Sequence, residues 1–225
     1  NVFAIVLTDE KNLEKYKNLI LERFEKPWNL ESIGYGAFSG CPNLTDIVIP
    51  ENVESIGNFA LARSGFTSIT IPASVTDIVA TAFEACPNLT TMSVEQGNTV
   101  YDSRDNCNAI INTSNNKLVL GCKNTAIPNL ITSIGDNAFY GIGCPENLVI
   151  PNSVTSIGEN AFSRCNGLVS IVIPNSVTTI EAYAFFGCLN LESVELSASL
   201  SSIGSWGFSS TSKLSNISLI LIHHS

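Results

Sequence analysis

The chain has 225 residues, of which 44% are hydrophobic and 14% charged, a balance typical of globular proteins and not of disordered ones. Eleven Lys and Arg stand against twenty Asp and Glu; residues 1–30 hold five of each, so the rest of the chain holds six basic and fifteen acidic residues. This acidic excess argues against nucleic acid and anionic membranes as partners, because both require a basic patch. No apolar run approaches the roughly 18 residues of a membrane helix, so no membrane insertion is expected.

Residues 8–27 (TDEKNLEKYKNLILERFEKP) predict a helix. Thr8 suits the N-cap position, and Pro27 ends the helix. Its apolar residues fall on one face: Leu13, Ile20, Leu21 and Phe24. Because a repeat protein needs a cover over its first repeat, we expect residues 1–29 to form a capping segment. The alternative is an amphipathic helix that binds a partner.

From residue 30 onward the chain repeats itself. IPNSVTSIGENAFSRCNGL (150–168) returns 23 residues later as IPNSVTTIEAYAFFGCLNL (173–191). A marker isoleucine defines seven units: Ile33, Ile56, Ile78, Ile134, Ile157, Ile180 and Ile203. An alanine four residues after the marker and a phenylalanine five after it recur in most units, which suits a short helical turn. Such repeats stack into a solenoid, since one unit cannot bury its apolar face alone, and we place this solenoid at residues 30–222, before a tail at 223–225.

Each unit ends in a short strand whose alternate residues are apolar, as in LVSIVIP (168–174). The residues between the apolar ones point outward, and stacking aligns them in columns along the solenoid. These columns, with two residues of the insertion described next, are the candidate partner-binding residues. They are Asp46, Val48, Thr70, Thr91, Ser93, Tyr101, Arg104, Asn147, Val149, Ser170, Val172, Ser193 and Glu195.

An insertion at about 95–127 separates the third and fourth units. AIINTSNNKLVL (109–120) predicts a β-hairpin, with either a two-residue turn at Asn115–Asn116 or a four-residue loop at 113–116. We expect this hairpin to stand off the solenoid on its binding side. Cys107 and Cys122 flank it, and the sequence leaves open whether they form a disulfide.

The other cysteines favour a structural role. Cys41, Cys86, Cys165 and Cys188 all lie eight residues after a marker isoleucine, which predicts free thiols buried in the core. No Cys-x-x-Cys motif occurs, so neither a zinc site nor another cofactor is expected. The two histidines, His223 and His224, are terminal, so no Ser-His-Asp or Cys-His arrangement is predicted and the chain is not expected to be an enzyme.

The pattern IPxSVTxIGxxAFxxCxxLxxI, as in residues 150–171, resembles the BspA-like leucine-rich repeat family. The resemblance implies an α/β-type repeat solenoid, wound as a right-handed coil with short parallel strands. It also implies a secreted or cell-surface protein that mediates adhesion or interaction with a protein or glycoprotein. The alternative is a structural spacer that presents another domain. The apolar run ISLILI (217–222) could in addition mediate end-to-end self-association.

Overall fold

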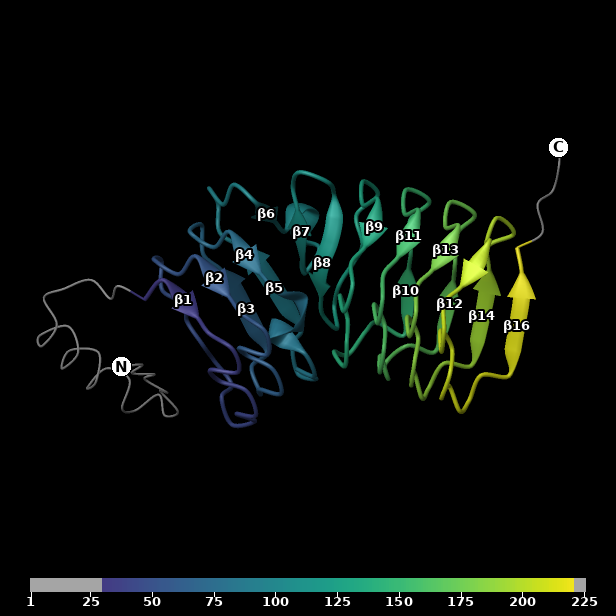
Figure 1. Ribbon diagram of the computed structural model, residues 1–225, viewed down its shortest axis with the longest axis horizontal. Coiled ribbons are helices and arrows are strands. Elements are labelled where there is room, and N and C mark those ends of the chain that lie inside the picture. Colours follow the sequence, from purple (N-terminus) through teal and green to yellow (C-terminus); the bar gives the residue numbers. More distant parts are fainter. Residues whose placement is uncertain (1–29, 221–225) are drawn as a thin grey trace, which may run out of the picture.

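The computed structural model describes residues 30–220, which form one elongated stack of coils (Figure 1). The repeats therefore build a solenoid, as predicted. The predicted α/β class is wrong for these residues, because they contain 3-10 turns but no α-helix. The predicted capping helix lies outside the described residues.

Two parallel ladders run along the stack. The short ladder is built from two-residue strands that each end in a marker isoleucine. Its N-terminal part orders β1-β2-β4, and its C-terminal part continues from β9 through β11 and β13 to β15. The strands are β1 Ser32–Ile33, β2 Ser55–Ile56, β4 Asp77–Ile78, β9 Ser133–Ile134, β11 Ser156–Ile157, β13 Thr179–Ile180 and β15 Ser202–Ile203.

The long ladder is built from the longer strands that carry the outward columns, and it lies along the other side of the stack (Figure 1). It is divided into a two-stranded sheet, β3-β5, and a four-stranded sheet, β10-β12-β14-β16. The strands are β3 Ser68–Ile71, β5 Thr91–Val94, β10 Asn147–Val149, β12 Ser170–Val172, β14 Ser193–Leu196 and β16 Asn216–Leu219. Both parts are parallel and in register, because a period of 23 residues returns each side chain to its own column.

The corner between the ladders cannot be helical, because left-handed residues recur in it. Six coils have a positive φ three residues after the marker: Gly36, Phe59, Asn137, Asn160, Tyr183 and Trp206. All seven have one seven residues after it: Gly40, Arg63, Ala85, Gly141, Arg164, Gly187 and Ser210. A left-handed residue every four positions interrupts a right-handed helix. Only the third coil, with no left-handed residue at its first corner, forms a 3-10 turn there, Ala80–Phe83.

The core fills the space between the ladders. Most residues of the alanine and phenylalanine columns are buried, with Ala37, Phe38 and Phe208 of the first and last coils as exceptions. In the C-terminal coils the rings stack nearly parallel from Phe139 through Phe162 and Phe185 to Phe208. Phe162 N donates to Ala184 O of the following coil at 2.7 Å, so the backbone beside the rings is also paired between coils. The small alanine leaves room for this close approach.

The insertion lies inside the stack, so the prediction that it stands off the solenoid is wrong. It consists of β6 Tyr101–Asp102, a 3-10 turn at Arg104–Asn106, β7 Ala109–Asn112 and β8 Lys117–Gly121. The antiparallel pair β7–β8 closes through the predicted four-residue loop 113–116, and β8 pairs in parallel with β9. Leu118 of β8 thereby takes the place of a marker isoleucine beside Ile134.

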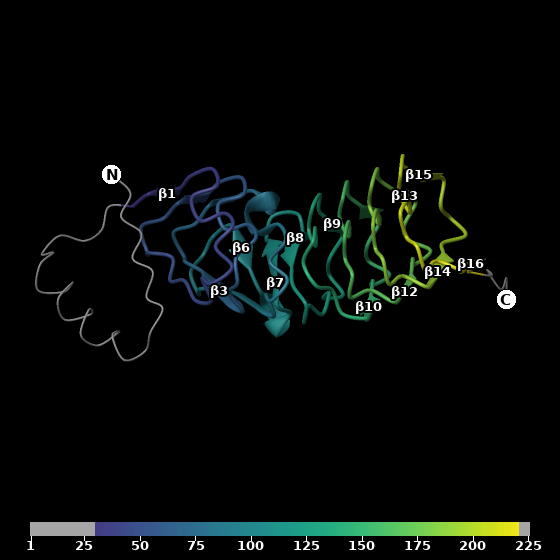
Figure 2. The same ribbon diagram turned by 90° about the horizontal axis from the view of Figure 1, so that it is seen from below.

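The inserted hairpin lies in the middle of the stack, as both ribbon views show (Figures 1 and 2), and the core on its two sides forms two separate clusters. Ile110 and Leu120 pack with the N-terminal half, whereas Ala109, Ile111 and Leu118 pack with the C-terminal half. Both faces of the hairpin are therefore apolar and buried. This explains why β7 and β8 do not alternate in polarity as an exposed hairpin would.

Candidate functional site

The C-terminal strand face is the outward side of β10, β12, β14 and β16. One column on it runs Asn147, Ser170, Ser193 and Asn216, and the next runs Val149, Val172, Glu195 and Ser218. The residues between them, Leu148, Ile171 and Val194, are buried. The predicted inward and outward positions of β10, β12 and β14 thus correspond to the structure. For β16 the prediction is wrong: its inward residues Ile217 and Leu219 are 60% and 63% exposed, because no further coil among the described residues packs on them. Outward side chains from four successive coils nevertheless meet on one surface.

An open groove of about 620 Å³ lies over the first two of these strands. Val149 and Val172 line it side by side and are 75% and 50% exposed. Beside them, the Ser170 hydroxyl donates to Asn147 Oδ1 at 2.8 Å, and Asn152 and Asn175 add further amides to the lining. The groove therefore combines an apolar strip with hydroxyl and amide groups, and its open shape suits a surface of another macromolecule better than an enclosed small molecule.

The candidate residues of the N-terminal half form a separate patch. Thr70 and Ser93 share a hydrogen bond of 3.0 Å between their hydroxyls, and Thr91 and Asp46 are exposed. Val48, in the same column as Val149, is 84% exposed. The predicted continuous column does not form, because the long ladder is divided between β5 and β10. Residues that follow the hairpin enter this gap, where Lys123 N donates to Leu89 O.

The two candidate residues of the insertion have internal roles. Tyr101 is buried, and its hydroxyl accepts a hydrogen bond from Ile78 N at 3.2 Å; burial raises the pKa of this phenol. The Arg104 guanidinium donates to both carboxylate oxygens of Asp102, at 2.7 and 2.9 Å, and to Asn116 Oδ1. The bonds to Asp102 raise the pKa of Arg104 further above its ordinary value. Both side chains therefore fix the insertion and are not free for a partner.

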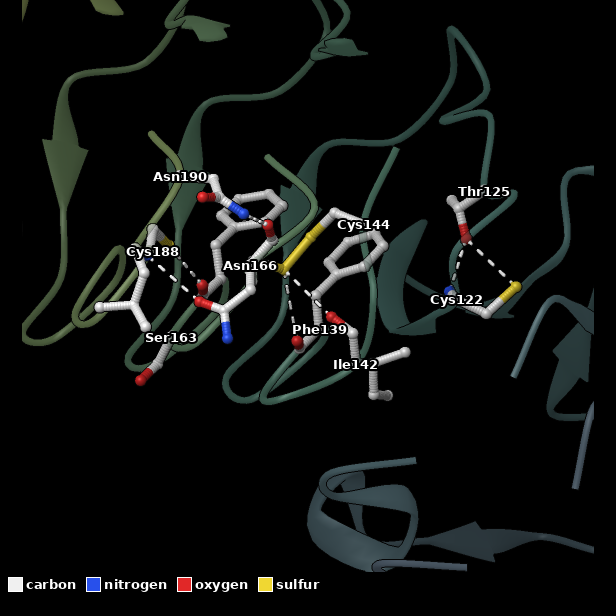
Figure 3. The surroundings of a disulfide bond; sticks show 12 residues. Cys122, Thr125, Phe139, Ile142, Cys144, Ser163, Asn166, Cys188 and Asn190 are labelled. Carbon is white, nitrogen blue, oxygen red and sulfur yellow. Dashed lines mark hydrogen bonds between the residues drawn. A yellow bond between two sulfur atoms is a disulfide. The ribbon is translucent and has the colours of Figure 1, made fainter. Parts of the chain in front are cut away.

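A disulfide between Cys144 and Cys165 ties the fourth coil to the fifth (Figure 3). Cys165 is fully buried as predicted, but the prediction of a free thiol there is wrong. The partner was missed because Cys144 lies ten residues after its marker instead of eight. Cys144-Pro145 is nevertheless the counterpart of Cys41-Pro42 and Cys86-Pro87, so alignment on this dipeptide would have placed Cys144 in the cysteine column.

The other five cysteines are free, including Cys107 and Cys122, which answers the question left open by the sequence. The column cysteines donate to carbonyl groups of the preceding coil: Cys86 Sγ to Leu61 O at 3.2 Å and Cys188 Sγ to Phe162 O at 3.0 Å. Burial raises the pKa of Cys86 to about 11 and that of Cys188 to about 12. These thiols remain protonated at neutral pH and are poor nucleophiles, because the thiolate is the reactive form.

Among residues 30–220, no group of three or more His, Cys, Asp or Glu side chains is placed to hold a metal ion. The same residues include no helix long and apolar enough to cross a membrane.

A family model for the BspA type leucine rich repeat region, in six copies, matches residues 12–131 and 132–221. No curated protein matches the chain significantly. Among solved structures, the chain is similar to a leucine rich cell surface protein of Faecalibacterium prausnitzii, with 29% identity and a TM-score of 0.64 over 86% of this chain and 58% of that one. It is also similar to the pneumococcal vaccine antigen PcpA, with 25% identity and a TM-score of 0.74 over 84% and 48%.

A leucine-rich repeat protein from Eubacterium ventriosum is similar as well, with 25% identity and a TM-score of 0.62 over 83% of this chain and 57% of that one. The chain therefore spans between about half and three fifths of the length of these three proteins. The likeness covers the solenoid, and the activities of the longer proteins do not follow from it.

Proposed function

Because the chain belongs to the BspA type leucine-rich repeat family, we propose that it is a cell-surface or secreted protein that binds a protein or glycoprotein, as in adhesion. The described solenoid would supply the contact surface, and the C-terminal strand face would be its centre. The similarity to a cell surface protein of Faecalibacterium prausnitzii and to a pneumococcal vaccine antigen supports this setting.

The exposed valine pair in the groove is the observation that carries the proposal. Val149 and Val172 are neighbours on adjacent strands and remain mostly exposed, although both strands also offer buried positions. Asn147 and Ser170 beside them supply polar groups, as the rim of a protein interface requires. A partner that covers both valines would remove a continuous apolar strip from water.

The affinity of such a surface would be spread over several coils. Binding hot spots are rich in Trp, Tyr and Arg, whereas the long-ladder columns of the four C-terminal coils consist of Asn, Ser, Val and Glu. We therefore expect a broad contact in which a single change, such as Ser193→Ala, weakens binding by less than the roughly 2 kcal/mol of a hot spot.

The decisive experiment compares the binding affinity of variants that carry glutamate in place of valine inside the groove and outside it. A partner is first captured from extracts of extracellular matrix and cell surfaces, and its affinity is measured by surface plasmon resonance. The double change Val149→Glu and Val172→Glu should weaken binding at least tenfold, because carboxylates would be desolvated in the contact. Val48→Glu introduces one carboxylate in the same column of the first coil and should have little effect. Equal loss in both proteins would contradict this location, and failure to capture any partner would favour a spacer.

The last strand offers a further surface for association. Ile217 and Leu219 of β16 are 60% and 63% exposed, and among residues 30–220 the strand β16 pairs only with β14. An open edge strand with exposed apolar residues is a template for pairing with another chain. End-to-end self-association would therefore use this edge, and sedimentation equilibrium of the wild type and of Ile217→Lys would reveal it.

A further inference from the structure

Three bulky aromatic residues occupy a left-handed backbone position at the corner of the solenoid. The column three residues after the marker has φ between 54° and 61° in six coils, and Gly36, Asn137 and Asn160 are its expected occupants. Phe59, Tyr183 and Trp206 adopt the same conformation with φ of 57°, 57° and 61°. A left-handed residue with a bulky side chain costs about 1–2 kcal/mol. Backbone stability therefore does not explain the choice of these three residues.

Two of them stack on each other at the corner of the last two described coils. The rings of Tyr183 and Trp206 are parallel to within 4°, with centroids 6.4 Å apart, and Phe186 meets Tyr183 edge-on at 5.8 Å. Trp206 is 60% exposed, whereas Phe185 of the neighbouring phenylalanine column is fully buried. We call Tyr183, Phe186 and Trp206 the aromatic platform. It belongs to the corner of the coils and not to the strand face.

Acidic side chains accompany the platform. Glu181 is exposed and precedes Tyr183 by two residues, and exposed Glu159 and Asp136 occupy the same corner of the two preceding coils. Glu159 N donates to Asp136 Oδ1 at 3.0 Å, which shows that these residues of adjacent coils lie together. Exposed carboxylates of three successive coils therefore lie at the corner of the solenoid that carries the aromatic rings.

The chain contains an example of the interaction that this combination favours. In the fifth coil, the Arg164 guanidinium carbon lies 5.8 Å from the centre of the Tyr140 ring of the fourth. A cation over the face of Trp or Tyr is attracted by the negative face of the ring, most strongly for Trp. Trp206 offers an exposed ring, and Glu181 adds a carboxylate.

We propose that the aromatic platform binds Arg or Lys side chains from an extended basic segment of a protein partner. The rings provide cation–π contacts, and the carboxylates of Glu181 and Glu159 complement the charge. The acidic excess of the chain outside residues 1–30, fifteen acidic against six basic residues, favours this occupant over a neutral or anionic one. The surface is distinct from the strand face, so the two sites can be tested separately.

The test uses the full chain with Tyr183 and Trp206 changed to asparagine, which occupies the same column at Asn137 and Asn160. Tyr183→Asn and Trp206→Asn should fold with an unchanged or higher melting temperature, because asparagine tolerates the left-handed conformation. Isothermal titration calorimetry with an Arg/Lys-rich nonapeptide should show affinity reduced about two- to fivefold by each change and about tenfold by both. Glu181→Gln should also weaken binding, whereas Tyr35→Asn, which removes an exposed tyrosine from the first coil, should not.

Several results would overturn the proposal. Equal affinity of the peptide for wild type and the double variant would show that net charge alone attracts it. A drop in melting temperature of several degrees in both asparagine variants would assign the rings a structural role. Binding of an uncharged nonapeptide or a neutral oligosaccharide to the platform as tight as that of the basic peptide would replace the proposed occupant.

Discussion

Replacement of Phe162 by alanine tests how strongly the ring stack holds the solenoid together. Phe162 is fully buried, and its ring lies between those of Phe139 and Phe185, with centroids 5.1 and 5.0 Å away. A buried Phe→Ala change usually costs about 3–5 kcal/mol. We expect the upper part of this range, because both ring contacts are lost and paired strands about 4.8 Å apart prevent the coils from collapsing into the cavity.

Two control variants separate the contributions. Phe208 has one stacked neighbour, Phe185 at 4.8 Å, and is only partly buried, so Phe208→Ala should cost roughly half as much as Phe162→Ala. Ser170 belongs to the outward column, and Ser170→Ala should change the free energy of unfolding by no more than about 0.5 kcal/mol.

Urea unfolding followed by circular dichroism gives the three free energies, provided that the slope with urea is the same in all variants. The expected order of destabilisation is Phe162→Ala, then Phe208→Ala, then Ser170→Ala. Equal midpoints for the Phe162 and Ser170 variants would refute the assignment of inward and outward positions. Equal losses for the two phenylalanines would show that a ring with two neighbours contributes no more than a terminal one.

Deletion of residues 98–124 should abolish the cooperative melting transition, because Ile110 and Ile111 pack on opposite halves of the core; a transition within a few degrees of wild type would contradict this. Thiol labelling of the denatured, unreduced protein should count five free cysteines, and seven after reduction; three before reduction would indicate a second cross-link. Burial raises the thiol pKa of Cys188 from 9.0 to about 12, so above about pH 9 the folded state retains a proton that the unfolded state loses. The free energy of unfolding should therefore fall between about pH 9 and pH 12, and it should fall less steeply in the variant Cys188→Ala.

The regular part of the fold was predictable because the same sequence pattern recurs in seven units. A period of 23 residues is sufficient to place Ile157 beside Ile180 and Ser170 beside Ser193, since parallel strands in register repeat their side chains. The burial of Phe162 and the exposure of Val172 follow from the same alternation. The helical turn expected at the corner is absent from most coils because asparagine, arginine and aromatic residues adopt left-handed conformations there. Their residue types do not predict a left-handed conformation at every one of these positions.

The insertion and the disulfide could not be read from the period, because both depart from it. The buried faces of β7 and β8 were visible as apolar residues, but one copy of a hairpin does not reveal whether solvent or a coil covers it. Tyr101 and Arg104 were predicted to bind a partner because Tyr and Arg are common in interfaces. In the structure, the Tyr101 hydroxyl accepts a hydrogen bond from Ile78 N, and Arg104 donates to Asp102. For the candidate site, the sequence predicted which strand residues of each coil point outward. It did not predict that the long ladder is divided into two patches.

The places where the period fails are also where the two halves of the protein meet. At this junction Gly121 faces the first ring of the C-terminal stack, and a Cβ atom there would lie within 2.1–2.8 Å of Phe139 ring atoms. Only glycine at position 121 leaves room for the Phe139 ring to pack against β8. Beside it, the Tyr101 hydroxyl accepts a hydrogen bond from Ile78 N of β4, the last strand in the N-terminal part of the short ladder. The disulfide then fastens the fourth coil, which stacks on the insertion, to the regular fifth coil. The relative placement of the two halves thus depends on the contacts of Gly121 and Tyr101. One bond of the repeat also crosses the junction, from Ala85 N to Tyr140 O at 3.2 Å. A partner that bridges Val48 and Val149 would therefore be sensitive to changes at Gly121, whereas one confined to the C-terminal strand face would not.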